Sequence, residues 1–295
     1  MFPIQTSGSR PPFFWVYGET TDVLLPRYLG PDQPLYGLMH EARSGKRVLY
    51  RTIPEIAANH LKEIQKVQPQ GPYYLGGFCF GGMVAFEIAQ QLQKQGQEVA
   101  ILFLVDPSAL NSWRSRFEKT ESFRSEISRH ARSLAGIDVW EKFKYVHVRV
   151  SDRINGIVDR GKNIAKTATR TAYFVTGRPL PPLLRLHYLD SVDHWAMNHY
   201  EPEEYTGDLI LFKSAQKSYD PDLIGNLIGG KFQVREVPSS HHDLLKEPNI
   251  GLWVNELRAC LEKAQVAQQK VHPSRTPREA EHAARLKQEK EIQSI

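Results

Sequence analysis

The chain has 295 residues, of which 41% are hydrophobic and 10% aromatic, so it can bury one sizeable core. Cysteine occurs only at positions 79 and 260, which excludes a disulfide framework and favours a reducing compartment. The net charge of +5 does not by itself indicate nucleic acid, and no apolar run approaches the length of a membrane span. The N-terminus lacks a basic region followed by an apolar stretch, so we expect a soluble cytoplasmic protein without a secretory signal.

Strands and helices alternate along the first part of the chain. Four apolar runs predict strands, at residues 13–17, 33–39, 73–75 and 99–105. Two amphipathic runs predict helices, at residues 53–67 and 83–92. Thr52 is a plausible N-cap of the first helix, with Pro54 in its first turn. This alternation predicts an α/β fold with a mostly parallel central sheet and helices on both faces.

The alternation stops after Pro107 and resumes later. Residues 110–187 have amphipathic helical patterns, and we expect them to form a helical lid inserted over the sheet edge. Strands resume at residues 207–213 and 231–237, and a last helix covers residues 247–263. The predicted organisation is therefore one core in two halves, at residues 1–109 and 188–263. A lid at residues 110–187 separates the halves, and a charged, mobile tail follows at residues 264–295.

A glycine-rich turn, Gly77-Phe78-Cys79-Phe80-Gly81-Gly82, joins a predicted strand to a predicted helix. This is the context of a nucleophile elbow, a strained turn whose central residue projects above the sheet at the positive end of a helix. The central residue here is Cys79, whose thiolate a helix N-terminus and a nearby histidine would favour. The alternative interpretation is a buried small apolar residue, as cysteines without a disulfide often are.

A nucleophile of this kind needs a base and an orienting carboxylate. Asp106 directly follows the strand after the elbow helix, at the sheet edge where the elbow lies, although an Asp-Pro turn is also common. We favour Asp106 over the later Asp220 and Asp222 as the acid. His241 and His242 follow the last strand and compete for the role of the base. We expect six of the remaining histidines to be surface or packing residues and not the base: His60, His130, His147, His187, His194 and His199.

Acyl transfer also requires donors for the developing oxyanion. The backbone N–H of Phe80, directly after the nucleophile, is expected to supply one donor. The other should come from the loop after the first strand, from Gly18 or Glu19.

Six segments carry a family resemblance, in chain order FFWVYG, DQPLYGL, VQPQGPYYLGGFCFGGMVAFEIAQQL, LFLVDPS, YEPEEYTGDLILF and HHDLLKEPNI. Together, over residues 12–262, they resemble the thioesterase domain of polyketide and nonribosomal peptide synthases. The resemblance implies an α/β-hydrolase fold with a mobile helical lid. It also implies release of an acyl or peptidyl chain from the phosphopantetheine arm of a carrier protein. Release would go through a covalent acyl-enzyme to water or an internal nucleophile.

The resemblance implies roles for three residues. Cys79 takes the place of the usual serine, Asp106 that of the acid, and the spacing to Leu244 selects His241 rather than His242 as the base. The chain departs from the family pattern in this cysteine, in the first loop, which reads YGETT, and in lacking a tryptophan after Phe212.

The lid sequence is basic. Residues 114–185 contain 16 Lys and Arg against 7 Asp and Glu. Carrier proteins of the resembling family are typically acidic, so a basic lid would steer such a partner to the site. Arg124, Arg129 and Arg132 are the candidate contacts, and a solvated helical face is the alternative interpretation.

The sequence therefore predicts a thioesterase that acts through an acyl-cysteine intermediate, by hydrolysis or cyclisation. The alternatives are an acyltransferase on the same scaffold, with an amine or hydroxyl acceptor, and a non-catalytic carrier-binding module. Neither a metal nor a redox cofactor is implied, and neither nucleic acid nor a membrane is an expected partner.

Overall fold

The computed structural model describes residues 1–17, 21–39, 46, 48–107, 166–216 and 222–271. Its strands form one seven-stranded sheet in the order β1-β3-β2-β4-β5-β6-β7. They are β1 (Phe2–Gln5), β2 (Phe13–Val16), β3 (Leu35–Leu38), β4 (Tyr73–Phe78), β5 (Val99–Val105), β6 (Leu209–Ser214) and β7 (Phe232–Val237). Only β1 pairs antiparallel to its neighbour within this sheet. The mostly parallel α/β architecture predicted from the sequence is confirmed.

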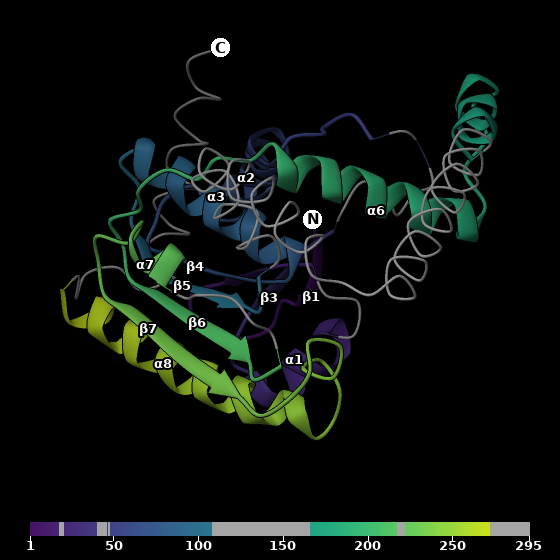
Figure 1. Ribbon diagram of the computed structural model, residues 1–295. Helices are drawn as coiled ribbons and strands as arrows, with labels where there is room; N and C mark the ends of the chain where they lie inside the picture. The colour runs from purple at the N-terminus through teal and green to yellow at the C-terminus, as the bar shows by residue number, and fades with distance from the viewer. Residues whose placement is uncertain (18–20, 40–45, 47, 108–165, 217–221, 272–295) are drawn as a thin grey trace, which may run out of the picture. The chain divides into compact units, whose positions relative to one another are not determined.

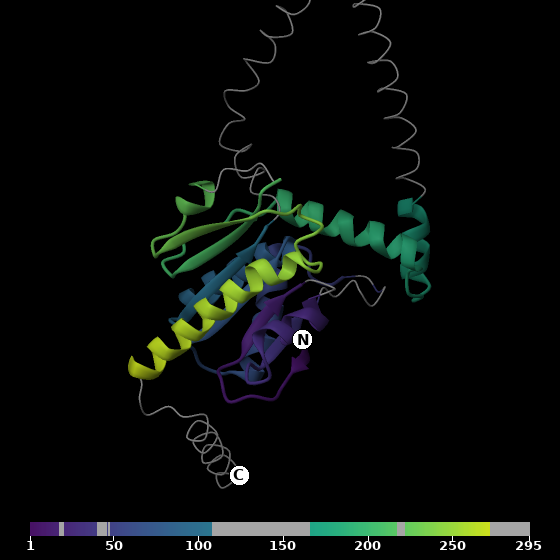
Figure 2. The ribbon, with the colours of Figure 1, turned by 90° about the horizontal axis from the view of Figure 1, so that it is seen from below.

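Helices cover both faces of the sheet (Figure 1). They are α1 (Thr21–Leu29), α2 (Ile53–Val67), α3 (Phe80–Lys94), α6 (Pro182–Asn198), α7 (Asp222–Gly225) and α8 (Asn249–Val271). Helices α2 and α3 pack together on one face, and α1 and α8 pack together on the other. Figure 2 shows α8 running along the sheet when the molecule is seen from below. The sheet is therefore buried on both sides, as the apolar sequences of β2 and β5 require.

Several predicted elements coincide with the structure and others are longer. Helix α2 has the predicted bounds, and its N-cap Thr52 forms a capping box with Glu55. Helix α3 starts at Phe80, earlier than expected, because the glycines of the turn continue into the helix. Helix α8 continues to Val271, so the first residues of the expected tail are helical, and the rest of the tail lies outside the described residues. Strand β1 and helices α1 and α7 had not been predicted from the sequence.

The core between the sheet and α8 is built on aromatic side chains. Trp15 of β2 and Trp253 of α8 are fully buried, and their rings stack with centroids 5.8 Å apart. The indole N–H of Trp253 donates a hydrogen bond of 2.9 Å to the carbonyl oxygen of Leu244. Trp253 therefore joins the sheet to the loop that follows β7.

The chain divides into two compact units. One comprises residues 1–40, 50–110 and 195–295, and the other residues 41–49 and 111–194. The division falls inside α6, as does the lid boundary expected after residue 187. Within the second unit, Val48, Leu180, Tyr188 and Val192 form a small apolar cluster. Residues 166–175 are helical, and the remainder of the predicted lid up to residue 165 lies outside the described residues.

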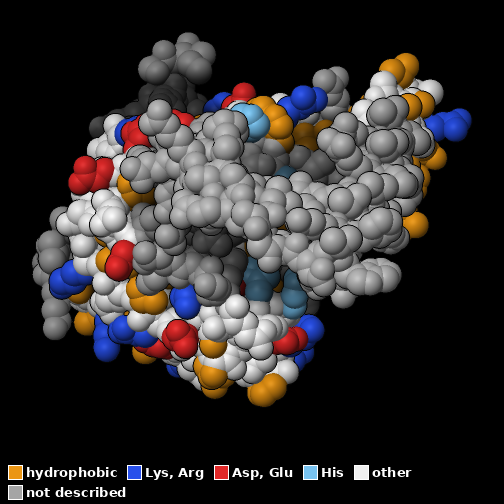
Figure 3. Space-filling model, viewed as in Figure 1, with side chains coloured by type: hydrophobic (Ala, Val, Ile, Leu, Met, Phe, Trp, Pro, Cys, Tyr) orange, Lys and Arg blue, Asp and Glu red, His pale blue; other side chains and the backbone are white. Residues whose placement is uncertain are grey.

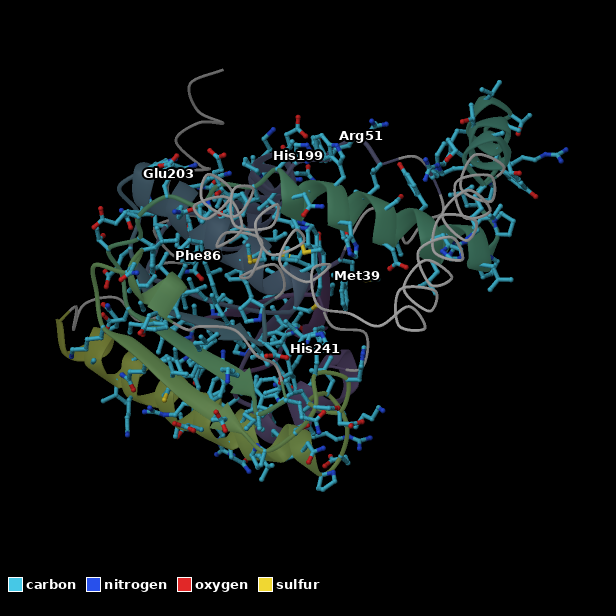
Figure 4. The ribbon with its side chains drawn as sticks, in the orientation of Figure 1. Met39, Arg51, Phe86, His199, Glu203 and His241 are labelled. Carbon is cyan, nitrogen blue, oxygen red and sulfur yellow. The ribbon has the colours of Figure 1, made fainter. Side chains whose placement is uncertain are left out.

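In the first unit, the chain that leaves α6 is fixed to α3. The hydroxyl of Tyr200 donates to Glu87 Oε2 at 2.8 Å, and Gln90 Oε1 lies 3.1 Å from the same hydroxyl and can share its proton. Burial and the carboxylate of Glu87 raise the pKa of Tyr200 well above its ordinary value, so its hydroxyl remains a donor. Glu203, labelled in Figure 4, extends the attachment through an ion pair of 2.8 Å with Lys94. The helix that begins at the elbow is thus anchored along its length.

We expect Trp253→Ala to lower the free energy of unfolding by about 3–5 kcal/mol, because it removes a fully buried indole and leaves a cavity. Urea denaturation followed by circular dichroism measures this loss. Leu252→Ala is the matched control on the same helix, since Leu252 is 53% exposed, and it should change stability by less than about 0.5 kcal/mol. Similar losses for the two variants would contradict the assignment of Trp253 to the core.

Candidate active site

Three neighbouring strands are each followed by a residue other than glycine that has a positive φ angle. Tyr17 after β2, Cys79 after β4 and Asp106 after β5 have φ angles of 56°, 54° and 45°. Such angles are strained for residues other than glycine and often mark functional sites. Because β2, β4 and β5 are adjacent and parallel, all three residues lie at one edge of the sheet.

Two glycines allow the turn around Cys79 to form. A Cβ on Gly77 would overlap the backbone of Gly81, and a Cβ on Gly81 would overlap the carbonyl group of Val16. The backbone N–H of Cys79 donates to the carbonyl oxygen of Val105 at 3.0 Å. Cys79 is thus held at the N-terminus of α3, where the helix dipole favours negative charge.

The carboxylate of Asp106 is fully buried and directed at His241. Its Oδ2 lies 2.5 Å from Nδ1 of His241. The same oxygen accepts a hydrogen bond of 2.9 Å from the hydroxyl of Ser214, and Oδ1 accepts one of 3.1 Å from the backbone N–H of Ser214. With Asp106 ionised, Nδ1 of His241 donates its proton, and the other ring nitrogen is the one suited to exchange protons with a substrate or nucleophile.

The ring of His241 lies beside the elbow. It stacks on the ring of Phe78, directly before Cys79, with centroids 4.9 Å apart and an interplanar angle of 18°. Its side chain is 24% exposed, and Figure 4 shows it at the edge toward which β6 and β7 point. Histidine side chains are visible at the surface in Figure 3. The imidazole of His241, the buried carboxylate of Asp106 and the turn at Cys79 therefore lie together, and the imidazole is partly exposed to solvent.

Local hydrogen bonds shape the loop that carries His241. The hydroxyl of Ser240 donates to Asp243 Oδ2 at 2.6 Å, and Lys246 forms an ion pair with Asp243. These contacts hold the pKa of Asp243 below its usual value, so this carboxyl stays ionised and engaged within the loop. The ring of His242 is exposed and meets that of His241 edge-on, with centroids 5.4 Å apart. Of the two histidines, His241 is the one that contacts Asp106.

The predicted oxyanion donors are only partly described. Phe80 is the first residue of α3, and its ring lies parallel to that of Tyr17, with centroids 5.9 Å apart. The hydroxyl of Tyr17 lies 3.0 Å from Nε2 of the buried His60 on α2. Tyr17 thus connects the end of β2, α2 and the first turn of α3. Gly18 and Glu19 lie outside the described residues.

The remaining candidates are placed as follows. Asp222 is exposed at the start of α7, whereas Asp220 lies outside the described residues. His187, His194 and His199 are exposed, as expected for surface residues. The structure does not describe His130, His147, the three arginines at 124, 129 and 132, or most of the tail, so the predictions for these residues lie outside the described part of the chain.

Sequence reasoning missed two parts of this edge. Ser214 binds Asp106, and its only signal in the sequence is its position at the end of a strand beside the one that Asp106 follows. His60 was expected to be a simple surface or packing residue, and its contact with Tyr17 has no signal in the sequence.

Within the residues that the structure describes, no cluster of histidine, cysteine and acidic side chains is arranged to hold a metal ion. Among the same residues, no helix is long and apolar enough to cross a membrane.

Comparison with known proteins gives a consistent set of matches. Residues 25–147 match the family model of the thioesterase domain. Vanchrobactin synthetase VabF of Vibrio anguillarum is 34% identical over 278 residues, which cover 89% of this chain and 9% of that protein. Malpibaldin synthetase of Mortierella alpina is 35% identical over 113 residues, or 37% of this chain and 2% of that protein. The chain thus spans less than a tenth of the length of these relatives.

Solved structures share the fold. The NocB thioesterase domain, in a covalent complex with a fluorophosphonate nocardicin G analog, matches with a TM-score of 0.53 and 21% identity, over 87% of this chain and 96% of that one. The four-domain nonribosomal peptide synthetase AB3403 matches with a TM-score of 0.57 and 21% identity, over 87% of this chain and 20% of that one. The sheet and its helices are therefore arranged as in an α/β-hydrolase.

We expect Gly81→Ala to destabilise the protein more than Gly82→Ala. Alanine favours a helix over glycine by about 1 kcal/mol, which would stabilise both variants. A Cβ at position 81 would overlap the Val16 carbonyl, however, whereas one at position 82 would lie 3.2 Å from Gly77 O and from Pro107 Cβ. Urea denaturation of both variants measures the difference, and equal stability would contradict the close approach of α3 to β2.

Proposed function

We propose that this chain, which belongs to the thioesterase-domain family, releases an acyl or peptidyl chain from the phosphopantetheine arm of a carrier protein. The reaction goes through a covalent acyl-cysteine intermediate and ends in hydrolysis or cyclisation. The observation that carries the proposal is the buried Asp106–His241 pair, with a separation of 2.5 Å, beside the elbow that presents Cys79.

In the first half of the proposed reaction, the Sγ of Cys79 attacks the carbonyl carbon of the incoming thioester. Nε2 of His241 takes the thiol proton, and the ionised Asp106 stabilises the resulting imidazolium. Negative charge moves to the carbonyl oxygen, where the N–H of Phe80 and that of Gly18 or Glu19 are the proposed donors. The carbon–sulfur bond to phosphopantetheine then breaks, and His241 gives its proton to the sulfur of the leaving thiolate.

In the second half, water or a nucleophile within the chain attacks the acyl group on Cys79. His241 removes a proton from the attacking group, and the Cys79 thiolate leaves and is protonated again. A thioester intermediate preserves the reactivity of the incoming thioester toward oxygen and nitrogen nucleophiles. The site can therefore pass the acyl group to either class of acceptor, and access of the acceptor decides the product.

The proposed partner is an acidic carrier domain. The surplus of nine basic residues over residues 114–185 would attract such a partner and increase its association rate at low salt. Arg124, Arg129 and Arg132 remain the proposed contacts. Salt should weaken turnover of a carrier-bound thioester and leave that of a small soluble thioester unchanged if this attraction operates.

We expect Cys79→Ala to reduce kcat by about a million-fold, because it removes the atom that forms the acyl-enzyme. Cys79→Ser should retain partial activity, since the geometry remains but the hydroxyl depends more on its base. Turnover of an acyl-thioester panel, with intact mass spectrometry of the enzyme, measures the rates and any acyl adduct. Wild-type turnover by Cys79→Ala would contradict the proposed mechanism.

The second cysteine provides an internal control. Burial raises the pKa of the Cys260 thiol, so less of it is ionised at neutral pH and it should react slowly. Iodoacetamide should inactivate the enzyme and modify Cys79 before Cys260. Inactivation that follows modification of Cys260 alone would contradict the assignment.

We expect His241→Ala to slow acylation by about 100- to 10,000-fold, because it removes the proposed base. His242→Ala is the matched control, since this neighbouring ring is exposed and the imidazole of His241 is the one paired with Asp106. Single-turnover acylation of the two variants measures both effects. A larger loss in His242→Ala would show that the base had been misassigned.

A further inference from the structure

We propose that Ser214 is a positioning residue that fixes the carboxylate of Asp106 in the orientation in which it binds His241. The proposal deepens the proposed function and rests on it for its effect on catalysis. Its structural basis is a pair of contacts from one buried residue to both oxygens of one buried carboxylate.

The two contacts differ in kind and are complementary. The backbone N–H of Ser214 donates to Oδ1 of Asp106 at 3.1 Å, and its hydroxyl donates to Oδ2 at 2.9 Å. Oδ2 is also the oxygen 2.5 Å from Nδ1 of His241. A carboxylate turns about a single bond, and two donors at separate oxygens determine its plane. Ser214 therefore sets the direction from which Asp106 accepts the hydrogen bond of the His241 imidazole.

Strand register explains why Ser214 faces Asp106. Val105 of β5 pairs with Phe212 of β6, and the N–H of Asp106 donates to the Phe212 carbonyl at 2.7 Å. With its φ of 45°, Asp106 ends the pairing there, whereas β6 continues to Ser214. The N–H of the next residue, Ala215, donates to β7, so by strand alternation that of Ser214 points toward β5. The Oδ1 of Asp106 accepts this N–H where the backbone carbonyl of Asp106 would accept it if the parallel pairing continued.

The hydroxyl is the part of this arrangement that a substitution can remove. Ser214→Ala keeps the backbone donor and removes the bond to Oδ2. A buried charged acceptor then loses one donor and some of its orientation. We expect acylation of Cys79 to slow by about 10- to 100-fold, which corresponds to one hydrogen bond to a charged group. Ser214→Cys, which has a similar volume and a weak donor, should lie between alanine and the wild type.

A double-mutant cycle separates positioning from a general structural role. Single-turnover acylation is measured for Ser214→Ala in the wild-type protein and in Asp106→Asn. If Ser214 acts through the carboxylate, its loss should change the rate less than about twofold once Asp106 is asparagine. An equal fold-loss in both backgrounds would overturn the proposal. Ser239→Ala is the matched control, because this buried serine donates to the Ser240 carbonyl instead, and its rate should stay near that of the wild type.

A second measurement does not depend on turnover. The Nδ1–H of His241, held by Asp106 at 2.5 Å, should give a far-downfield proton NMR signal that is absent from His241→Ala. Ser214→Ala should move this signal upfield or broaden it, and Ser239→Ala should leave it in place. An unchanged signal in Ser214→Ala would overturn the proposal even if thioesters are turned over. A changed signal in a protein that does not acylate Cys79 would instead overturn the proposed function and support the positioning role.

Discussion

The close approach of the first turn of α3 to the ends of β2 and β4 is the constraint on which the edge of the sheet depends. Only glycine at positions 77 and 81 leaves room for it, because a Cβ at either would overlap neighbouring backbone. This contact sets the φ of Cys79 at 54° and places the thiol at the helix N-terminus. It also brings Phe80 against Tyr17, so the end of β2 and the start of α3 pack directly against each other.

Parallel pairing then gathers residues that are far apart in the chain. Strands β4 and β5 end at the same level and β2 ends one residue earlier, and each is followed by a residue with positive φ. Asp106 therefore emerges beside the elbow, and Ser214 meets it from β6. The histidine arrives on a longer loop, which Trp253 secures from the opposite face of the sheet. Core packing around α8 thus supports the loop that carries His241.

A cysteine at the elbow changes the demands on its neighbours. A thiol is more easily ionised than a hydroxyl, so the helix N-terminus and an imidazolium contribute more and proton abstraction contributes less. In the proposed mechanism, the buried carboxylate serves mainly to hold the imidazole in one tautomer and orientation. Such a role would require a fixed carboxylate, which the two hydrogen bonds from Ser214 to Asp106 would provide.

The sequence by itself determined the features that local chemistry encodes. Apolar runs, the capping box at Thr52 and the glycines around Cys79 were sufficient for the alternating α/β order and the elbow. Spacing and family resemblance selected Asp106 and His241 as the predicted acid and base for Cys79. They could not show that the two side chains are in contact. Only the tertiary structure showed that His241 contacts Asp106, that Ser214 donates to the same carboxylate, and that His60 contacts Tyr17. These contacts depend on strand register and on packing between distant segments, which no local pattern of residues records.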